Sequence, residues 1–171
     1  MLRNIILILG LYWGASAMGQ TIPLIEQYVP KAQLVGQARL KVLFWNVYDA
    51  KLYAAAGVWS SEMPFALSLK YLRDLDGADI AKRSIDEIRQ QGFDDEQAMA
   101  RWYDTLLKII PDVSDASTII GLRNAEGGTI LYHNNQLIGE VAEPLFGRWF
   151  FNIWLGEKTS EPKLRSKLLG E

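Results

Sequence analysis

The residues best suited to chemistry are arginines and a tyrosine at the margins of apolar strand patterns. Tyr71 falls in line with an apolar row that begins at Phe65, and Arg73 follows with the same parity. Arg39 has a similar setting beside Leu43. A guanidinium can hold a carboxylate or phenolate through two hydrogen bonds while a tyrosine hydroxyl donates another. This pattern is typical of a pocket for an amphipathic acid. An arginine that reaches out of the core to a surface carboxylate would give the same spacing.

Other catalytic designs are excluded by residue content. The chain has no cysteine and one histidine, His133, so it cannot build a multi-histidine metal site or use thiol chemistry. It contains neither a Gly-x-Ser-x-Gly elbow nor a glycine-rich phosphate loop. His133 falls in a predicted hairpin turn, which favours a solvated turn residue over a general base. We therefore expect no metal and no cofactor.

Acidic residues cluster in two places, Asp86 with Glu87 and the run 94–96. The first pair falls on the polar face of a predicted helix, and the run falls in the first turn of the next helix. Negative charge is favourable at a helix N-terminus. We interpret both clusters as exposed structural features and not as a catalytic carboxylate pair.

Length and charge limit the class of protein. The 171 residues predict one domain, and 49% hydrophobic with 22% charged residues are ordinary for a globular protein. The formal net charge of −2 provides no overall positive field for a phosphate backbone. Nucleic acid is therefore not an expected partner, and we expect a monomer.

The first 17 residues have the three regions of a secretory signal peptide. Arg3 gives a positive start, an apolar run covers 5–13, and Ala15-Ser16-Ala17 is a small-x-small cleavage pattern. The run is shorter than the ~20 residues that a spanning helix needs. We expect cleavage after Ala17, a mature domain over 18–171, an exported (periplasmic or secreted) location and no stable membrane span after cleavage.

The remaining chain shows strand and helix periods in alternation. Residues 20–30 look like a lead-in segment. Strand patterns then cover 34–55 (two strands with a turn near 45–46), 65–72, 117–123 and 129–141, the last with a turn at 133–136. Helical patterns begin near 76, 95, 144 and 162. This order predicts an α+β fold, an antiparallel sheet with helices packed on one face.

Three segments carry a family resemblance. Residues 36–40 with 44–53, then 65–73, and finally 150–156 with 164–165 resemble, in order and spacing, the chalcone isomerase-like family and its exported bacterial branch. The resemblance implies that family's open-faced β-sandwich. The family contains plant isomerases that close a chalcone into a flavanone, and plant relatives that bind fatty acids.

The resemblance also implies site residues. Arg39 matches the arginine that holds the ligand's anionic group. Tyr48 matches the position where the fatty-acid binders place a tyrosine and the isomerases a threonine. The tyrosine that isomerases use after the following strand is replaced here by Ile80 or a neighbour. The resemblance thus favours a non-catalytic binder of a fatty-acid-like or aromatic acid, with Arg39, Tyr48, Tyr71 and Arg73 as ligand-binding residues.

Two alternatives stay open at this point. One is an intramolecular lyase of the chalcone isomerase type, in which an arginine stabilises a phenolate nucleophile. The other is an interaction module that uses an aromatic surface around Trp149, Phe151 and Trp154. The last two residues fall off the apolar stripe of their predicted helix, so they pack against the sheet or lie exposed.

Overall fold

A computed structural model describes residues 18–171, and the predicted signal peptide, residues 1–17, lies outside the described residues. The helices are α1 (Met18–Glu26), α2 (Gly77–Gln90), α3 (Glu96–Ile109), α4 (Pro144–Leu155) and α5 (Pro162–Leu169). The strands are β1 (Ala32–Val42), β2 (Trp45–Ala55), β3 (Phe65–Tyr71), β4 (Thr118–Arg123), β5 (Thr129–His133) and β6 (Gln136–Val141). The predicted strands and the four later helices are confirmed within a few residues.

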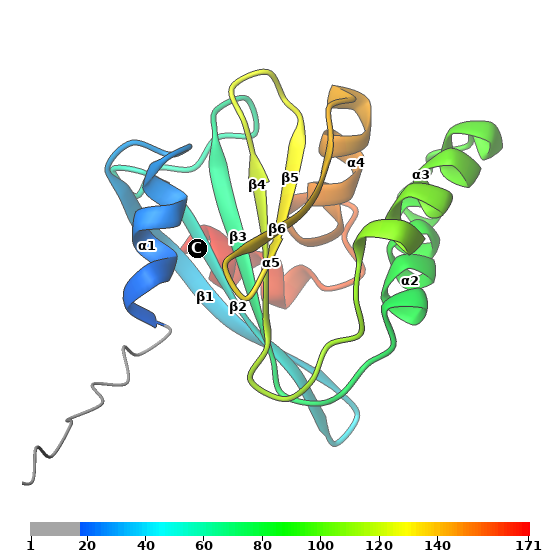
Figure 1. Cartoon of the computed structure of the whole chain (residues 1–171), viewed down its shortest axis with the longest axis horizontal. Coiled ribbons are helices and arrows are strands. Elements are labelled where there is room, and N and C mark those ends of the chain that lie inside the picture. Colours follow the sequence, from blue (N-terminus) through cyan, green and yellow to red (C-terminus); the bar gives the residue numbers. More distant parts are fainter. Residues whose placement is uncertain (1–17) are drawn as a thin grey trace, which may run out of the picture.

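The six strands form one sheet in chain order, and each pairs antiparallel with its neighbour (Figure 1). Antiparallel neighbours need only short connections, and the two tight hairpins are closed by residues with positive φ. Leu43 has φ 54° between β1 and β2, and Asn134 and Asn135 have 49° and 65° between β5 and β6. The α+β fold class predicted from element order is confirmed.

One face of the sheet carries the main core. The side chains of Phe65, Leu67, Leu69 and Tyr71 alternate toward this face, as predicted from the period of two. Helices α2, α3 and α4 lie together on this side in Figure 1, and α4 contributes Phe146, which is fully buried. The helical layer therefore lies where the apolar strand faces require it.

The opposite face has a smaller core under α1. Leu24, Ile25 and Val29 pack on Ala66, Ile120, Leu122, Ile130 and Tyr132. The prediction of helices on one face thus needs a correction, because residues 20–30 are not a simple lead-in and most of them form α1, on the other side (Figure 1). The residues around α1 include Ala32 at the start of β1. Further along β1 and β2, Arg39 and Asp49 are partly exposed on this face, and we call this part of the sheet the open face.

Helix α5 crosses β1 at Gly36. A Cβ atom on Gly36 would overlap the backbone carbonyl groups of Lys167 and Leu168. Only glycine allows the helix backbone to approach the strand this closely. This contact fixes the C-terminal helix against the edge of the sheet.

Candidate ligand-binding site

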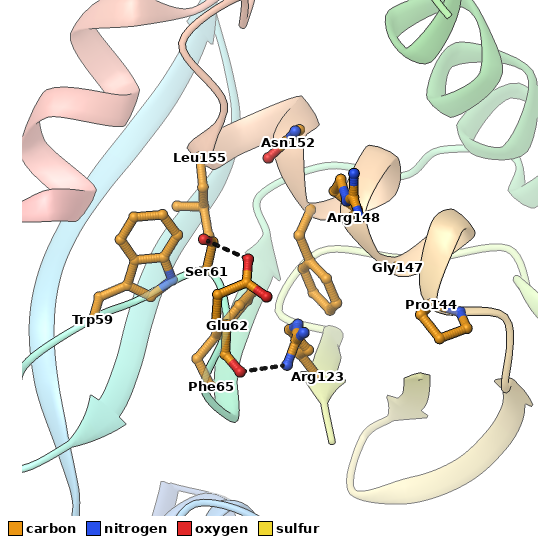
Figure 2. Close-up of a pocket in the computed structure, with 11 residues that line it drawn as sticks. Trp59, Ser61, Glu62, Phe65, Arg123, Pro144, Gly147, Arg148, Asn152 and Leu155 are labelled. Atoms are coloured by element: carbon orange, nitrogen blue, oxygen red, sulfur yellow. Dashed lines mark hydrogen bonds between the residues drawn. The ribbon is translucent and has the colours of Figure 1, made fainter. Parts of the chain in front are cut away.

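One cavity lies between α4, the loop after β2 and the adjoining ends of β3 and β4. Its volume is about 440 Å³, within the range of small-molecule sites. Figure 2 shows its lining side chains converging from these four segments. The lining residues are Trp59, Ser61, Glu62, Phe65, Arg123, Pro144, Gly147, Arg148, Phe151, Asn152 and Leu155.

The floor of the cavity is apolar and tightly packed. Phe65 and Phe151 meet edge to face with ring centroids 4.8 Å apart, and Trp59 lies 6.0 Å from Phe65. Phe65, Phe151 and Leu155 are all buried. Aromatic rings in such contacts hold their positions, so the floor is pre-formed.

Two arginines stand over this floor. Register places Arg123 opposite Phe65 and therefore on the helix-facing side of β4. Its Nη1 donates to the carbonyl oxygens of Glu62 and Asn124, each at 3.2 Å, which leaves the rest of the guanidinium available (Figure 2). Arg148 is exposed on α4, and no salt bridge of Arg148 is found within 18–171.

One carboxylate shares the cavity with the arginines. Glu62 accepts a hydrogen bond from Ser61 at 3.2 Å, and Figure 2 shows it between Ser61 and Arg123. Two arginines against one glutamate leave the lining with a net positive charge. The indole Nε1 of Trp59 is buried and has no hydrogen-bond partner among residues 18–171. The site can therefore accept an anion and offers donors to hold it.

A second hollow of about 460 Å³ shares Trp59, Ser61, Asn152 and Leu155 with the first. It continues past the C-terminal end of α4 to Lys158 and Arg165, with Glu157 also at its edge. We call the two hollows together the α4 groove. Its lining runs from Pro144 at the start of α4 to Lys158 beyond the end of that helix.

The sequence-predicted anion anchor lies elsewhere. Arg39 is paired in register with Asp49, and its Nε and Nη2 donate to the two carboxylate oxygens at 2.6 and 2.8 Å. Both side chains are on the open face of the sheet and are partly exposed. The guanidinium holds the pKa of Asp49 below its ordinary value and its own pKa is raised by the same hydrogen bond. Arg39 therefore forms an ion pair with a surface carboxylate, which is the alternative that the sequence pattern also allowed.

Tyr48 and Tyr71 do come together, on the opposite face from Arg39. They are register partners, and their rings meet edge to face with centroids 5.9 Å apart. The Tyr48 hydroxyl accepts a hydrogen bond of 2.9 Å from Nε1 of Trp154. Because the sheet separates Arg39 from Tyr48, these two residues cannot hold one carboxylate. Neither tyrosine lines the α4 groove.

Arg73 follows the end of β3 and lies beside the end of the β1–β2 hairpin. Its guanidinium carbon is 5.0 Å from the centre of the Trp45 ring, a cation–π distance. Of the four predicted ligand residues, only Tyr48 and Tyr71 contact each other. None of the four lines the cavity. A ligand-binding role for the four stays a prediction.

The arginines that line the cavity were missed, although the sequence held a signal for each. Arg123 closes the strand pattern of 118–123 with the parity of Ile119 and Gly121. Arg148 precedes Asn152 and Leu155 by four and seven residues, which places the three on one side of a helix. The sequence alone does not show that β4 and α4 pack beside each other, so the two arginines could not be assigned to one site.

Two further expectations need correction. Glu87 was expected to be exposed but is 5% exposed, with an ion pair to Arg83 and one carboxylate oxygen without a hydrogen-bond partner among residues 18–171. His133 was expected to be a solvated turn residue, but it ends β5, and its Nε2 is buried without a hydrogen-bond partner among residues 18–171. It does not line the groove.

Phe151 and Trp154 are buried against the sheet, and Trp149 is partly buried. These residues therefore form no contiguous exposed aromatic surface, which removes the basis for the interaction-module alternative.

Residues 30–170 match the chalcone isomerase-like family. The chain belongs to this family. A Haemophilus influenzae protein described as uncharacterized is 25% identical over 140 residues, which cover 81% of this chain and 68% of that protein.

The crystal structure of a fatty-acid binding protein from Arabidopsis thaliana superposes on this family member with a TM-score of 0.66. The match covers 82% of this chain and 87% of the plant chain at 14% identity. The likeness confirms the chalcone isomerase-like fold implied by the sequence motifs. At this identity it says nothing about individual ligand contacts.

The part of the chain between residues 18 and 171 contains no group of three or more potential metal-ligating His, Cys, Asp or Glu side chains. None of its helices is long and apolar enough to span a membrane.

Replacing Arg39 with alanine tests the sequence-based site. We expect ligand affinity and the thermal midpoint to stay at the wild-type values, because Arg39 is on the open face and its pair with Asp49 is solvent-exposed. Calorimetric titration with a fatty acid, beside a melting curve, checks this. A loss of affinity at an unchanged midpoint would restore Arg39 as the anion anchor.

Replacing Tyr48 with phenylalanine tests the buried tyrosine pair. The change leaves the Trp154 indole N–H unpaired, at a cost of about 1–3 kcal/mol at neutral pH. Burial raises the pKa of both Tyr48 and Tyr71 above the ordinary value of 10.0. Their stabilising contribution is therefore complete below pH 10 and is lost as the pH rises toward the folded-state pKa.

Denaturant unfolding between neutral pH and pH 11 measures this contribution. The free energy of unfolding should fall above pH 10, and Tyr48→Phe should reduce the slope by up to about 1.4 kcal/mol per pH unit. An alkaline slope identical in wild type and variant would show that Tyr48 titrates normally in the folded protein.

Proposed function

We propose that the protein is a non-catalytic binder of a small amphipathic acid, which lies in the α4 groove with its anionic group at Arg123 and Arg148. The observation that carries the proposal is that these two arginines line one cavity together with the buried rings of Phe65 and Phe151. Family membership and the fold shared with a fatty-acid binding protein support it.

The anionic end is held by charge and hydrogen bonds. Arg123 has its Nη1 engaged by backbone carbonyls, so the guanidinium is already positioned before a ligand arrives. Arg148 comes from a helix and needs only a side-chain adjustment. A charge-assisted hydrogen bond contributes about 1.5–3 kcal/mol when it is shielded from water. Two such contacts outweigh the repulsion from Glu62, whose carboxylate can turn to solvent.

The apolar body lies along the rings and Leu155, and it extends past Asn152 toward the second hollow. Each buried methylene contributes about 0.8 kcal/mol. Affinity should therefore rise with chain length until the groove is filled. An acyl chain uses this length more fully than a compact aromatic acid, so we name fatty acids as the ligand class.

The groove offers little for the isomerase alternative. None of its lining residues is a tyrosine or a histidine, and its carboxylates are Glu62 and Glu157. No observation in this part of the chain favours turnover of a phenolic substrate, so binding is the function we propose.

We also infer an exported location, which rests on the three-part pattern of residues 1–17. The test is mass spectrometry of the protein recovered outside the cytoplasm. A mature N-terminus at Met18 supports export with cleavage after Ala17. An intact Met1 in a cytoplasmic fraction would contradict it.

Isothermal titration with octanoate, decanoate and dodecanoate tests the binding function. We expect one site per chain and an affinity that rises up to about fourfold per added methylene. Dodecanol, which has the same chain and no charge, is the matched ligand and should bind much more weakly. Equal affinity for the acid and the alcohol would contradict an arginine-anchored site.

A further inference from the structure

The end of the β1–β2 hairpin is a second feature that the ligand site does not explain. Its four consecutive apolar residues are exposed: Val42 by 50%, Leu43 by 86%, Phe44 by 98% and Trp45 by 62%. In Figure 1 this hairpin reaches beyond the ends of the neighbouring strands. We call residues 42–45 the apolar tip.

The conformation of the tip displays these side chains. Leu43 has a positive φ of 54°, a turn conformation for which glycine or asparagine is normally used. The side chains of Leu43 and Phe44 in this two-residue turn do not stabilise the fold, because neither is buried in the core. A contiguous exposed apolar group of this kind marks a surface that contacts something else.

Two basic residues, Lys41 and Arg73, adjoin the tip. Lys41 precedes it in the chain, and Arg73 lies over the Trp45 ring at 5.0 Å. Asp74, the acidic neighbour of Arg73, accepts a hydrogen bond from the backbone of Asp115 at 3.1 Å.

The open face of the sheet behind the tip is also basic. Register places Arg39 and Lys70 on either side of Asp49, and Lys51 one rung further along β2. The hydrogen bond from Arg39 lowers the pKa of the Asp49 carboxyl, and the charges of Lys70 and Lys51 lower it further. Three cations around one carboxylate leave this face positively charged.

We propose that the apolar tip inserts into the interface of an anionic lipid bilayer, with the surrounding basic residues on the lipid phosphates. The tip is convex and projects from the body, so it suits a soft surface that closes around it better than a preformed pocket. Tryptophan and basic residues are the side chains favoured at a membrane interface. Each lysine or arginine near an anionic surface adds to the attraction.

The α4 groove stays free in this arrangement. The tip is at the start of β2, whereas Trp59 and the cavity follow the end of that strand. Membrane docking and ligand binding can therefore succeed or fail separately.

A fluorophore placed on the tip tests the proposal. The chain has no cysteine, so Phe44→Cys in the full-length protein can be labelled at one position with an environment-sensitive dye. Val58→Cys, 74% exposed in the loop at the far end of β2, is the matched control. The probe surface is vesicles of phosphatidylethanolamine and phosphatidylglycerol, with pure phosphatidylcholine vesicles for comparison.

We expect dye at position 44 to shift to shorter wavelength with anionic vesicles and to be quenched by acyl-chain nitroxide lipids, while dye at position 58 does neither. Changing Lys41 and Lys70 to glutamine should raise the lipid concentration for half-maximal shift roughly fivefold per lysine. The position 58 label corrects for any membrane attachment through residues 1–17. An unshifted label at position 44 would overturn the proposal and direct the search to a protein partner.

Discussion

Replacing Arg123 and Arg148 together with glutamine should weaken dodecanoate binding by about 100-fold or more. Each guanidinium contributes a charge-assisted hydrogen bond, and losing one costs about 1.5–3 kcal/mol, or roughly 10-fold or more in affinity. Arg148→Gln alone should show the smaller loss, because Arg148 is exposed. Arg123→Gln should show the larger one, since Arg123 also positions the Glu62 backbone. Isothermal titration measures both.

The matched control is Arg101→Gln, an exposed arginine on α3 that does not line the groove. It changes the net charge of the protein by the same amount as Arg148→Gln. Its affinity should equal that of the wild type, and melting curves of all variants should superpose within a few degrees. If Arg101→Gln weakened binding as much as Arg148→Gln, the effect would be one of overall charge and the groove assignment would fail.

Replacing Gly36 with alanine should give the largest loss of stability for the smallest chemical change. The new methyl group overlaps the carbonyl groups of Lys167 and Leu168, and backbone atoms cannot move aside as a flexible side chain can. Overpacking of this kind costs about 3 kcal/mol, which lowers the thermal midpoint by roughly 6–12 °C in a domain of this size. Differential scanning calorimetry records the midpoint.

Gln37→Ala is the control for that change, because Gln37 is the exposed neighbour on the same strand. Its midpoint should stay close to that of the wild type. Hydrogen exchange adds a structural reading: Gly36→Ala should speed exchange in 162–169 and leave α2 unchanged. A Gly36→Ala midpoint equal to that of the Gln37→Ala variant would show that α5 does not pack on β1 as described.

Local patterns were sufficient to predict most of the fold. The period-two row from Phe65 to Tyr71 is buried on one face as predicted. Asp95 caps α3 through a 2.9 Å hydrogen bond from the Ala98 N–H, and Pro144 opens α4. These features depend on neighbours in the chain, so the sequence contains them. Helix α1 was missed because Pro23 lies inside it and its burial depends on strands far along the chain.

The site could not be predicted in the same way, because it depends on long-range register. Arg39 and Tyr48 are close in sequence, yet the pairing of Arg39 with Asp49 and of Leu40 with Tyr48 puts them on opposite faces. Arg123 and Arg148 are brought together by the packing of α4 beside β4. A shift of one residue in a strand moves every side chain to the other face of the sheet. The strand register must therefore be known before two residues can be assigned to the same site.

A photoreactive dodecanoate that carries a diazirine at the end of its chain gives the most direct test of the binding site. After irradiation, mass spectrometry of protease fragments identifies the labelled residues. We expect labelling in the loop at 59–65 and along α4 at 147–156. Unmodified dodecanoate should compete with this labelling, and the Arg123→Gln, Arg148→Gln variant should lose it. Labelling confined to the strands around Arg39, Tyr48 and Tyr71 would contradict it and place the ligand away from the α4 groove.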